Sequence, residues 1–69
     1  MTDDRLVACL RILELPAMPT PVELRAAYRR LCKRYHPDRF AADAERTRIA
    51  TEILVELNAA YAYARRRVG

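Results

Sequence analysis

Apolar side chains recur at helical spacing in three stretches of the 69-residue chain. Steps of three and four residues place each apolar set on one face of a helix. The pattern therefore predicts helices at about residues 4–14, 21–35 and 47–66, and no strands. The apolar faces consist of Leu6, Leu10 and Leu13 in the first helix, Leu24, Ala27, Tyr28, Leu31 and Tyr35 in the second, and Ala50, Ile53, Leu54, Leu57, Ala60, Tyr61 and Ala64 in the third.

Caps and prolines mark the predicted helix ends. Thr2 or Asp3 can cap the first helix, and Pro16 ends it because the residue before a proline avoids the helical region. A capping box with proline at the first helical position is predicted in the segment TPVE at residues 20–23. Pro37 stops the second helix, which leaves residues 36–46 as a loop.

These elements predict an all-α bundle in a single domain that covers residues 1–69. Helices two and three are the longest, and a loop of about ten residues between them predicts antiparallel packing with helix one across both. A chain this short has a net stability of roughly 3–5 kcal/mol. It has room for one small core and for surface features, but hardly for a deep substrate cavity.

Composition disfavours catalysis, metal binding and membrane insertion. There is no Ser and no Gly before Gly69, so a nucleophilic serine and a phosphate-binding glycine loop are both missing. Cys9 and Cys32 match no usual zinc spacing, and we expect buried free thiols. No apolar run approaches the ~18 residues of a membrane span. The sequence therefore predicts no enzyme activity, no cofactor and no metal, in a cytoplasmic monomer.

Positive charge is concentrated in one segment and one tail. The formal net charge is +4. Residues 21–40 carry six basic and two acidic side chains, and residues 65–67 add three Arg, whereas residues 1–20 sum to −1 and residues 41–64 to −2. Such a distribution indicates an acidic protein surface or a nucleic acid as the partner.

The basic residues of helix two form a row. Arg25, Arg29 and Lys33 are each four residues apart and share one helical face, with Arg30 and Arg34 beside them. Like charges at this spacing repel by a few tenths of a kcal/mol per pair. The row is therefore either a solvated face or a surface that binds a partner.

The tripeptide His36-Pro37-Asp38 follows this row directly. Pro37 disfavours a helical His36 and so defines how the chain leaves the helix. Asp38 is then displayed as an exposed carboxylate, a group that binds guanidinium through short, charge-assisted hydrogen bonds. We interpret the tripeptide as a docking point for another protein.

Nucleic-acid binding is the main rival to this interpretation. Basic helical rows do enter DNA grooves. However, helix two begins with Glu23 in its first turn, where phosphate contacts would be wanted. We therefore expect a protein partner rather than a nucleic acid.

Beyond these patterns, the sequence resembles the J domain of the DnaJ (Hsp40) co-chaperone family over about residues 8–64. Helix two, LRAAYRRLCKRYHPDRF, resembles the family run of Ala-Tyr, Leu and Tyr-His-Pro-Asp-Arg/Lys. Helix three, LVELNAAYAYA, is similar to the family run around Asn-x-Ala-Tyr, and LRILEL in helix one resembles the Leu-Gly-Val segment. A His-Pro-Asp tripeptide is weak alone, but its combination with the Ala-Tyr helix and Asn-x-Ala-Tyr is very specific.

The resemblance implies a module that docks on an Hsp70 (DnaK-type) chaperone, stimulates its ATP hydrolysis and promotes client capture. It implies that His36, Pro37 and Asp38 carry the stimulation. It implies that a basic docking surface meets an acidic surface of Hsp70, and the matching residues are Arg25, Tyr28, Arg29, Arg30, Lys33, Arg34 and Arg39. The alternatives are a J-like interaction module without an Hsp70 partner and the basic nucleic-acid-binding domain.

The chain departs from the family pattern at several positions. Cys9 and Leu10 stand in place of the Tyr of helix one, and Glu14 stands where Gly is usual. Ala64 replaces a Leu, with Tyr63 nearby to fill the space. The Asp-Pro turn and the short fourth helix are missing, and residues 65–67 stand there as a run of Arg that we expect to be a solvated helix end. We therefore expect a somewhat differently packed core, in a domain of a longer protein or in a stand-alone minimal J protein.

Overall fold

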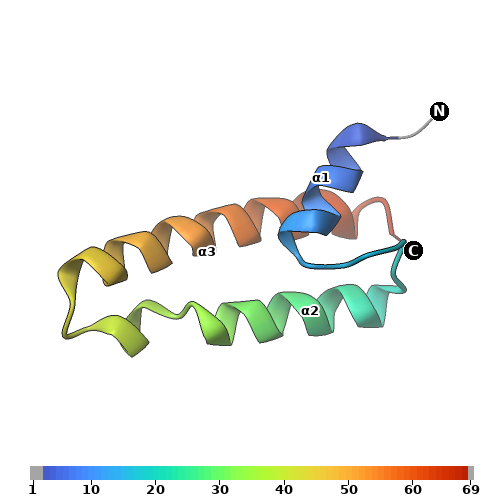
Figure 1. Cartoon of the computed structure of the whole chain (residues 1–69). Coiled ribbons are helices and arrows are strands. Elements are labelled where there is room, and N and C mark those ends of the chain that lie inside the picture. The colour runs from blue at the N-terminus through green and yellow to red at the C-terminus, as the bar shows by residue number, and fades with distance from the viewer. Residues whose placement is uncertain (1–2, 69) are drawn as a thin grey trace.

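Two long antiparallel helices and a short helix across one end make up the structure, a computed structural model that describes residues 3–68 (Figure 1). The elements are α1 (Asp4–Ile12), α2 (Pro21–Arg34), the 3-10 turn η1 (Pro37–Phe40) and α3 (Ala44–Arg65). The bundle is elongated, at 45 × 21 × 18 Å. No strand occurs within the described residues, so the predicted all-α fold is confirmed.

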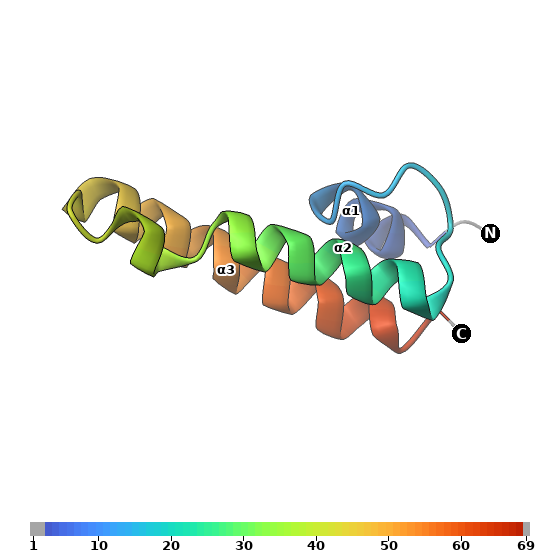
Figure 2. The same cartoon turned by 90° about the horizontal axis from the view of Figure 1, so that it is seen from below.

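The arrangement separates two ends of the molecule. α1 and both described ends of the chain lie at one end, which we call the closed end, and η1 lies at the other, which we call the open end (Figures 1 and 2). α1 packs against α3 at the closed end, and η1 packs against α3 at the open end.

Helix α1 ends at Ile12, two residues before the predicted end at residue 14. Its end is a Schellman motif, in which the Leu15 amide donates to the Leu10 carbonyl (2.8 Å) and the Glu14 amide to the Arg11 carbonyl (2.9 Å). Glu14 adopts the left-handed conformation that this motif needs, with φ 59°. The chain therefore turns out of the helix before Pro16 is reached.

Helix α3 begins at Ala44, three residues before the predicted start. The Asp43 carboxylate accepts a hydrogen bond from the Arg46 amide (3.1 Å), so Asp43 is the N-cap. The predicted loop of residues 36–46 is correspondingly shorter and contains η1. The capping box of α2 has the predicted geometry: the Glu23 amide donates to the Thr20 hydroxyl (3.2 Å), and the Thr20 amide to the Glu23 carboxylate (2.8 Å).

The core is formed by the apolar faces that the periodicity predicts. The buried hydrophobic residues are Leu6, Cys9, Leu10, Leu13, Leu24, Ala27, Leu31, Ala50, Leu57, Ala60, Ala64 and Val68. Leu13 and Ala64 have no exposed surface. Val68 was not predicted, and it is buried because the chain turns back after α3, with the Val68 amide donating to the Ala64 carbonyl (3.0 Å).

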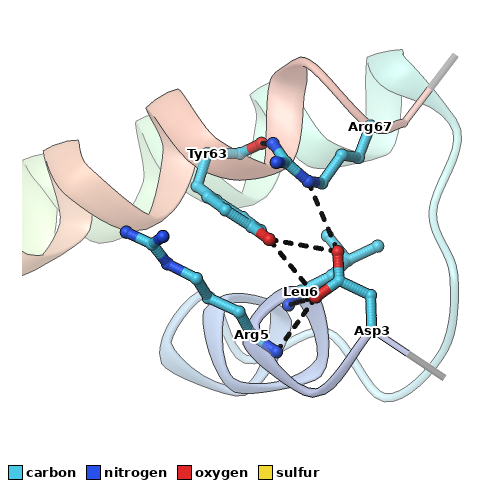
Figure 3. Close-up of polar contacts among 5 residues, drawn as sticks. All are labelled: Asp3, Arg5, Leu6, Tyr63 and Arg67. Atoms are coloured by element: carbon cyan, nitrogen blue, oxygen red, sulfur yellow. Dashed lines mark hydrogen bonds and ion pairs between the residues drawn. The ribbon is translucent and has the colours of Figure 1, made fainter.

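A cluster of four polar and aromatic side chains joins α1 to α3 at the closed end (Figure 3). We call Asp3, Arg5, Tyr63 and Arg67 the terminal clasp. Asp3 caps α1 by accepting from the Arg5 and Leu6 amides, each at 3.1 Å. The other predicted cap, Thr2, lies outside the described residues.

The remaining contacts of Asp3 reach across to α3 and the residues after it. The Tyr63 hydroxyl donates to both Asp3 carboxylate oxygens (3.2 and 3.1 Å), and the Arg67 guanidinium lies 3.3 Å from one of them. Two guanidiniums lie over the Tyr63 ring, that of Arg67 at 3.6 Å and that of Arg5 at 4.5 Å from the ring centre. Arg67 is therefore part of the packing and not only the solvated helix end predicted for residues 65–67.

Candidate functional site

The tripeptide His36-Pro37-Asp38 lies at the open end, at the junction of α2 and η1. Tyr35 closes α2, its amide donating to the Leu31 carbonyl (3.0 Å), and His36 then leaves the helix with an extended backbone (φ −63°, ψ 128°). Pro37 is the first residue of η1, where its fixed φ suits the turn and no amide hydrogen is missed.

The backbone on both sides of Asp38 is held by His36. The imidazole Nδ1 accepts from the Asp38 amide (3.2 Å), and the His36 carbonyl accepts from the Arg39 amide (3.0 Å). An imidazole that accepts at Nδ1 carries its proton on Nε2. His36 is thus the cap of η1, which fixes the turn that presents Asp38.

The Asp38 side chain is 92% exposed. Its partner in the nearest ionisable pair is the His36 imidazole, with 3.7 Å between Nδ1 and Oδ2, too long for a hydrogen bond. Within the described residues, no Lys or Arg pairs with Asp38. The carboxylate therefore keeps its acceptor capacity for a group outside the chain.

Arg39 turns back onto the end of α2. Its Nη1 donates to the carbonyls of Lys33 (3.4 Å) and Arg34 (3.2 Å). The last carbonyls of a helix have no partner within the helix, and a cation is favourable near them because of the helix dipole. The side chain thus lies against backbone, unlike the other basic residues of the predicted docking surface.

Four basic side chains project from α2 into solvent, and we call them the basic row: Arg25, Arg29, Arg30 and Lys33. Among residues 3–68, no carboxylate lies within 4.0 Å of any of these charged groups. Arg34, at the end of the helix, lies 3.7 Å from the Glu14 carboxylate, in a pair with both side chains more than half exposed. The positive field of α2 is therefore largely uncompensated within the domain.

The cations in the first half of α3 are arranged differently. Arg48 lies 2.6 Å from Glu45 and 2.9 Å from Glu52, and these carboxylates raise the pKa of its guanidinium. Arg46 lies 3.5 Å from Asp43. These Arg side chains pair with carboxylates three or four residues away at or within α3, whereas those of the basic row have no carboxylate partner in the described part of the chain.

Tyr28 lies between α2 and α3 rather than among the exposed charges of the basic row. Its ring stacks on that of Tyr61, with centres 4.2 Å apart and planes at 7°, and its hydroxyl donates to the Asn58 side-chain oxygen. Burial raises the pKa of the Tyr28 hydroxyl, and the neighbouring Cys32 thiol raises it further. Tyr28 therefore contributes to the interface that orients the basic row.

Comparison with known proteins identifies the family. The DnaJ domain family matches residues 9–64, which is most of the chain. The chain belongs to the DnaJ domain family. A DnaJ-like protein of Mycoplasma genitalium is 40% identical over 50 residues, and the match covers 72% of this chain and 14% of that protein. No solved structure matches the chain.

DnaJ-domain proteins act as co-chaperones rather than as enzymes, and the family generally partners with Hsp70. The three helices of this chain, with no strand among the described residues, are consistent with a J domain, and the His-Pro-Asp tripeptide lies between the two long helices. No helix within residues 3–68 has the length and apolar character needed to cross a membrane. In the same part of the chain, no group of three or more His, Cys, Asp or Glu is placed to hold a metal ion.

Sequence reasoning missed the residues that attach the tripeptide loop of this J domain to α3. The Thr47 hydroxyl donates to the Phe40 carbonyl (2.6 Å), which also accepts from the Asp43 amide (2.8 Å). Phe40 and Ile49 line a shallow apolar groove beside the loop. Asp43, an N-cap residue type ahead of a helical run, was the signal that could have placed this junction.

Proposed function

We propose that this J domain docks on a DnaK-type Hsp70 chaperone and stimulates its ATP hydrolysis, thereby promoting client capture. His36, Pro37 and Asp38 carry the stimulation in this proposal, and the basic row with Tyr28, Arg34 and Arg39 forms or supports the docking surface. The domain itself performs no bond chemistry. It acts as a monomer in the cytoplasm.

The observation that carries the proposal is the contrast between two kinds of charge on adjoining surfaces. The basic row has no acidic partner within the described residues, and Asp38 beyond its end is 92% exposed with no basic partner. Unpaired charges of both signs, held on a helix and a capped turn, suit a partner with an acidic surface and a basic group beside it.

The two kinds of charge have different roles. Exposed cations mainly raise the rate of encounter and set the register of the complex, because such pairs are screened by salt and each contributes only about 0–1 kcal/mol. A carboxylate that enters a partner's cleft and binds a guanidinium there forms a shorter and stronger bond. Asp38 therefore favours the hydrolysis-competent state of Hsp70 only if it binds that state more tightly than the others.

Single-turnover ATP hydrolysis by a DnaK-type Hsp70, with and without this chain, tests the proposal. We expect acceleration by the wild-type chain and none by Asp38→Asn, which keeps the size of the side chain and removes its charge. Glu56→Gln is the matched control, because Glu56 is another exposed carboxylate without an ion-pair partner within the described residues. Circular dichroism should show the same helix content for all three proteins.

Two results would contradict the proposal. If Asp38→Asn accelerates hydrolysis as well as the wild type does, the carboxylate does not have the role assigned to it. A wild-type chain without effect on hydrolysis that binds duplex nucleic acid with a steep salt dependence would favour the nucleic-acid alternative instead.

A further inference from the structure

Within residues 3–68, Arg39 is the one member of the predicted docking surface whose guanidinium donates to backbone carbonyls on the neighbouring helix. The charged groups of the basic row bind no carboxylate or carbonyl within the described residues. The Nη1 of Arg39 instead donates to the Lys33 and Arg34 carbonyls, which would otherwise be orphans at the end of α2. Its position in the fold thus differs in kind from that of the basic row.

The attachments of η1 show what this contact does. On one side, the Phe40 carbonyl is bound by Thr47 at the start of α3. On the other side, within residues 3–68, the Arg39 guanidinium is the side-chain group that hydrogen-bonds η1 to α2. The turn that carries Asp38 is therefore fixed at two points, one on each long helix.

The two points determine the direction of the Asp38 carboxylate. His36 holds the turn locally, through the Asp38 amide and the Arg39 amide, but those bonds lie within residues 36–39 and move with them. Arg39 connects residues 36–39 to the end of α2, the helix that carries the basic row. Without that bond, the turn could rotate about the extended backbone of His36 relative to the basic row.

We propose that Arg39 is a positioning residue, which holds η1 against the end of α2 and thereby sets the position of Asp38 relative to the basic row. Its effect on stimulation rests on the function proposed above. Its anchoring of the turn is a property of the isolated domain and can be measured without any partner. Loss of the guanidinium affects how well Asp38 acts once docked and leaves the encounter itself nearly intact.

Three variants separate a positioning role from a docking role. Arg39→Met removes the guanidinium and keeps an unbranched side chain. Arg39→Lys keeps the charge and a donor for one carbonyl. Arg30→Met is the matched comparison, because it makes the same chemical change at an exposed cation of the basic row that binds no carbonyl within the described residues.

Hydrolysis by Hsp70 is then measured as a function of the concentration of each variant. We expect Arg39→Met to lower the maximal stimulated rate about tenfold or more with little change in the concentration that gives half the effect, since misplaced groups lose rate at saturation. We expect Arg30→Met to raise that concentration a few-fold and to keep the maximal rate. Arg39→Lys should recover part of the maximal rate that Arg39→Met loses.

Amide hydrogen exchange in the isolated domain gives the second readout. We expect the Asp38 and Arg39 amides to exchange about tenfold faster in Arg39→Met, because η1 without its anchor on α2 opens its local hydrogen bonds to His36 more often. They should be unchanged in Arg30→Met. Helix content by circular dichroism should be the same in all variants.

The results distinguish failure of this inference from failure of the proposed function. Unchanged exchange in Arg39→Met, with only the half-effect concentration raised, would show that Arg39 is an ordinary docking cation and would overturn the inference. A wild-type chain that does not stimulate Hsp70 would overturn the proposed function and with it the consequence for stimulation. In that case faster exchange in Arg39→Met would still establish the anchoring of the turn.

Discussion

At the closed end of this J domain, Asp3, Tyr63 and Arg67 satisfy one another, whereas at the open end Asp38 offers its carboxylate to solvent. Both carboxylates stand at the start of a helical turn, Asp3 as the N-cap of α1 and Asp38 as the second residue of η1. The difference lies in the partners that reach them from other elements. Asp3 receives a phenol and a guanidinium from the far end of the chain, and Asp38 receives none within the described residues.

This difference separates stability from recognition. Leu13, the C-cap of α1, has no exposed surface, and the terminal clasp joins the start of the same helix to α3 (Figure 3). The open end has a shallow groove and the half-exposed Ile49 instead. In this arrangement the contacts at the closed end stabilise the fold, and the open end presents the Asp38 carboxylate on η1.

The largest effect on stability is expected from truncating the core where α1 packs. Leu13→Ala removes a side chain with no exposed surface, and such a change costs about 2–5 kcal/mol. Because the total stability of a domain this small is roughly 3–5 kcal/mol, we expect Leu13→Ala to be largely unfolded. Ile49→Ala, at the open end, removes a side chain that is 42% exposed and should cost less than half as much.

Urea unfolding followed by circular dichroism measures both variants. A folded Leu13→Ala protein, or an Ile49→Ala protein destabilised to the same degree, would show that the core is not divided between the ends as described. Equal slopes of the unfolding free energy with denaturant are needed for the comparison, because a changed slope would indicate a changed unfolded state.

A smaller effect is expected from the two aspartates that define the comparison. The pKa of the Asp3 carboxyl is lowered, first by the hydrogen bond from the Leu6 amide and then by the Tyr63 hydroxyl and the Arg67 guanidinium, against an opposing effect of burial. A carboxyl with a lowered pKa stabilises the fold above its unfolded value of 3.8, and this contribution is lost as the pH falls through the folded pKa. Asp3→Asn should therefore lower the melting temperature at neutral pH and make little difference once the wild-type carboxyl is protonated.

Asp38→Asn is the matched control for this prediction. Its carboxylate has no charged or hydrogen-bonding partner from another element within the described residues, so we expect the same melting temperature as the wild type at neutral pH. Thermal scans at a series of pH values from about 7 downward measure both variants, and the difference between Asp3→Asn and the wild type should shrink as the pH falls below 3.8 and the wild-type carboxyl takes up its proton. A pH-independent loss in Asp3→Asn would mean that its charge is not what holds the clasp.

The sequence predicted the fold class because the apolar periodicity and the prolines both act locally. Spacings of three and four residues placed Leu24 and Leu31 in the core, and the capping box at residues 20–23 formed as expected. The tripeptide was recognised from its residues alone, and its place after α2 followed from Pro37. These features needed no knowledge of distant contacts.

The features that were missed depend on residues far apart in the chain. The clasp joins Asp3 to residues about sixty positions away, and no local pattern indicates such a pair. The burial of Val68 likewise depends on the turn after α3 and on the core that it reaches. The bonds from Arg39 to the end of α2 require the turn of η1, so the sequence indicated only another cation beside the tripeptide.

The smallest effect is expected at Glu14, where α1 ends and its side chain approaches Arg34 at the end of α2. Its φ of 59° places a residue with a Cβ in the left-handed region, which costs roughly 1 kcal/mol relative to glycine. The pair with Arg34 is 3.7 Å long and exposed on both sides, so it returns only about 0–1 kcal/mol. Glu14→Gly should therefore raise the free energy of unfolding slightly, by about 0.5 kcal/mol.

Glu14→Ala separates the two contributions, because alanine keeps the Cβ and removes the carboxylate. If the backbone dominates, Glu14→Ala should be no more stable than the wild type, and Glu14→Gly should be the more stable of the two variants in urea unfolding. The reverse order would mean that Glu14 is retained for its contact with Arg34. In that case the ion pair between Glu14 and Arg34 joins α1 to the end of α2, where Arg39 also binds. The open end would then depend on the closed end for its position, although Asp38 itself is exposed.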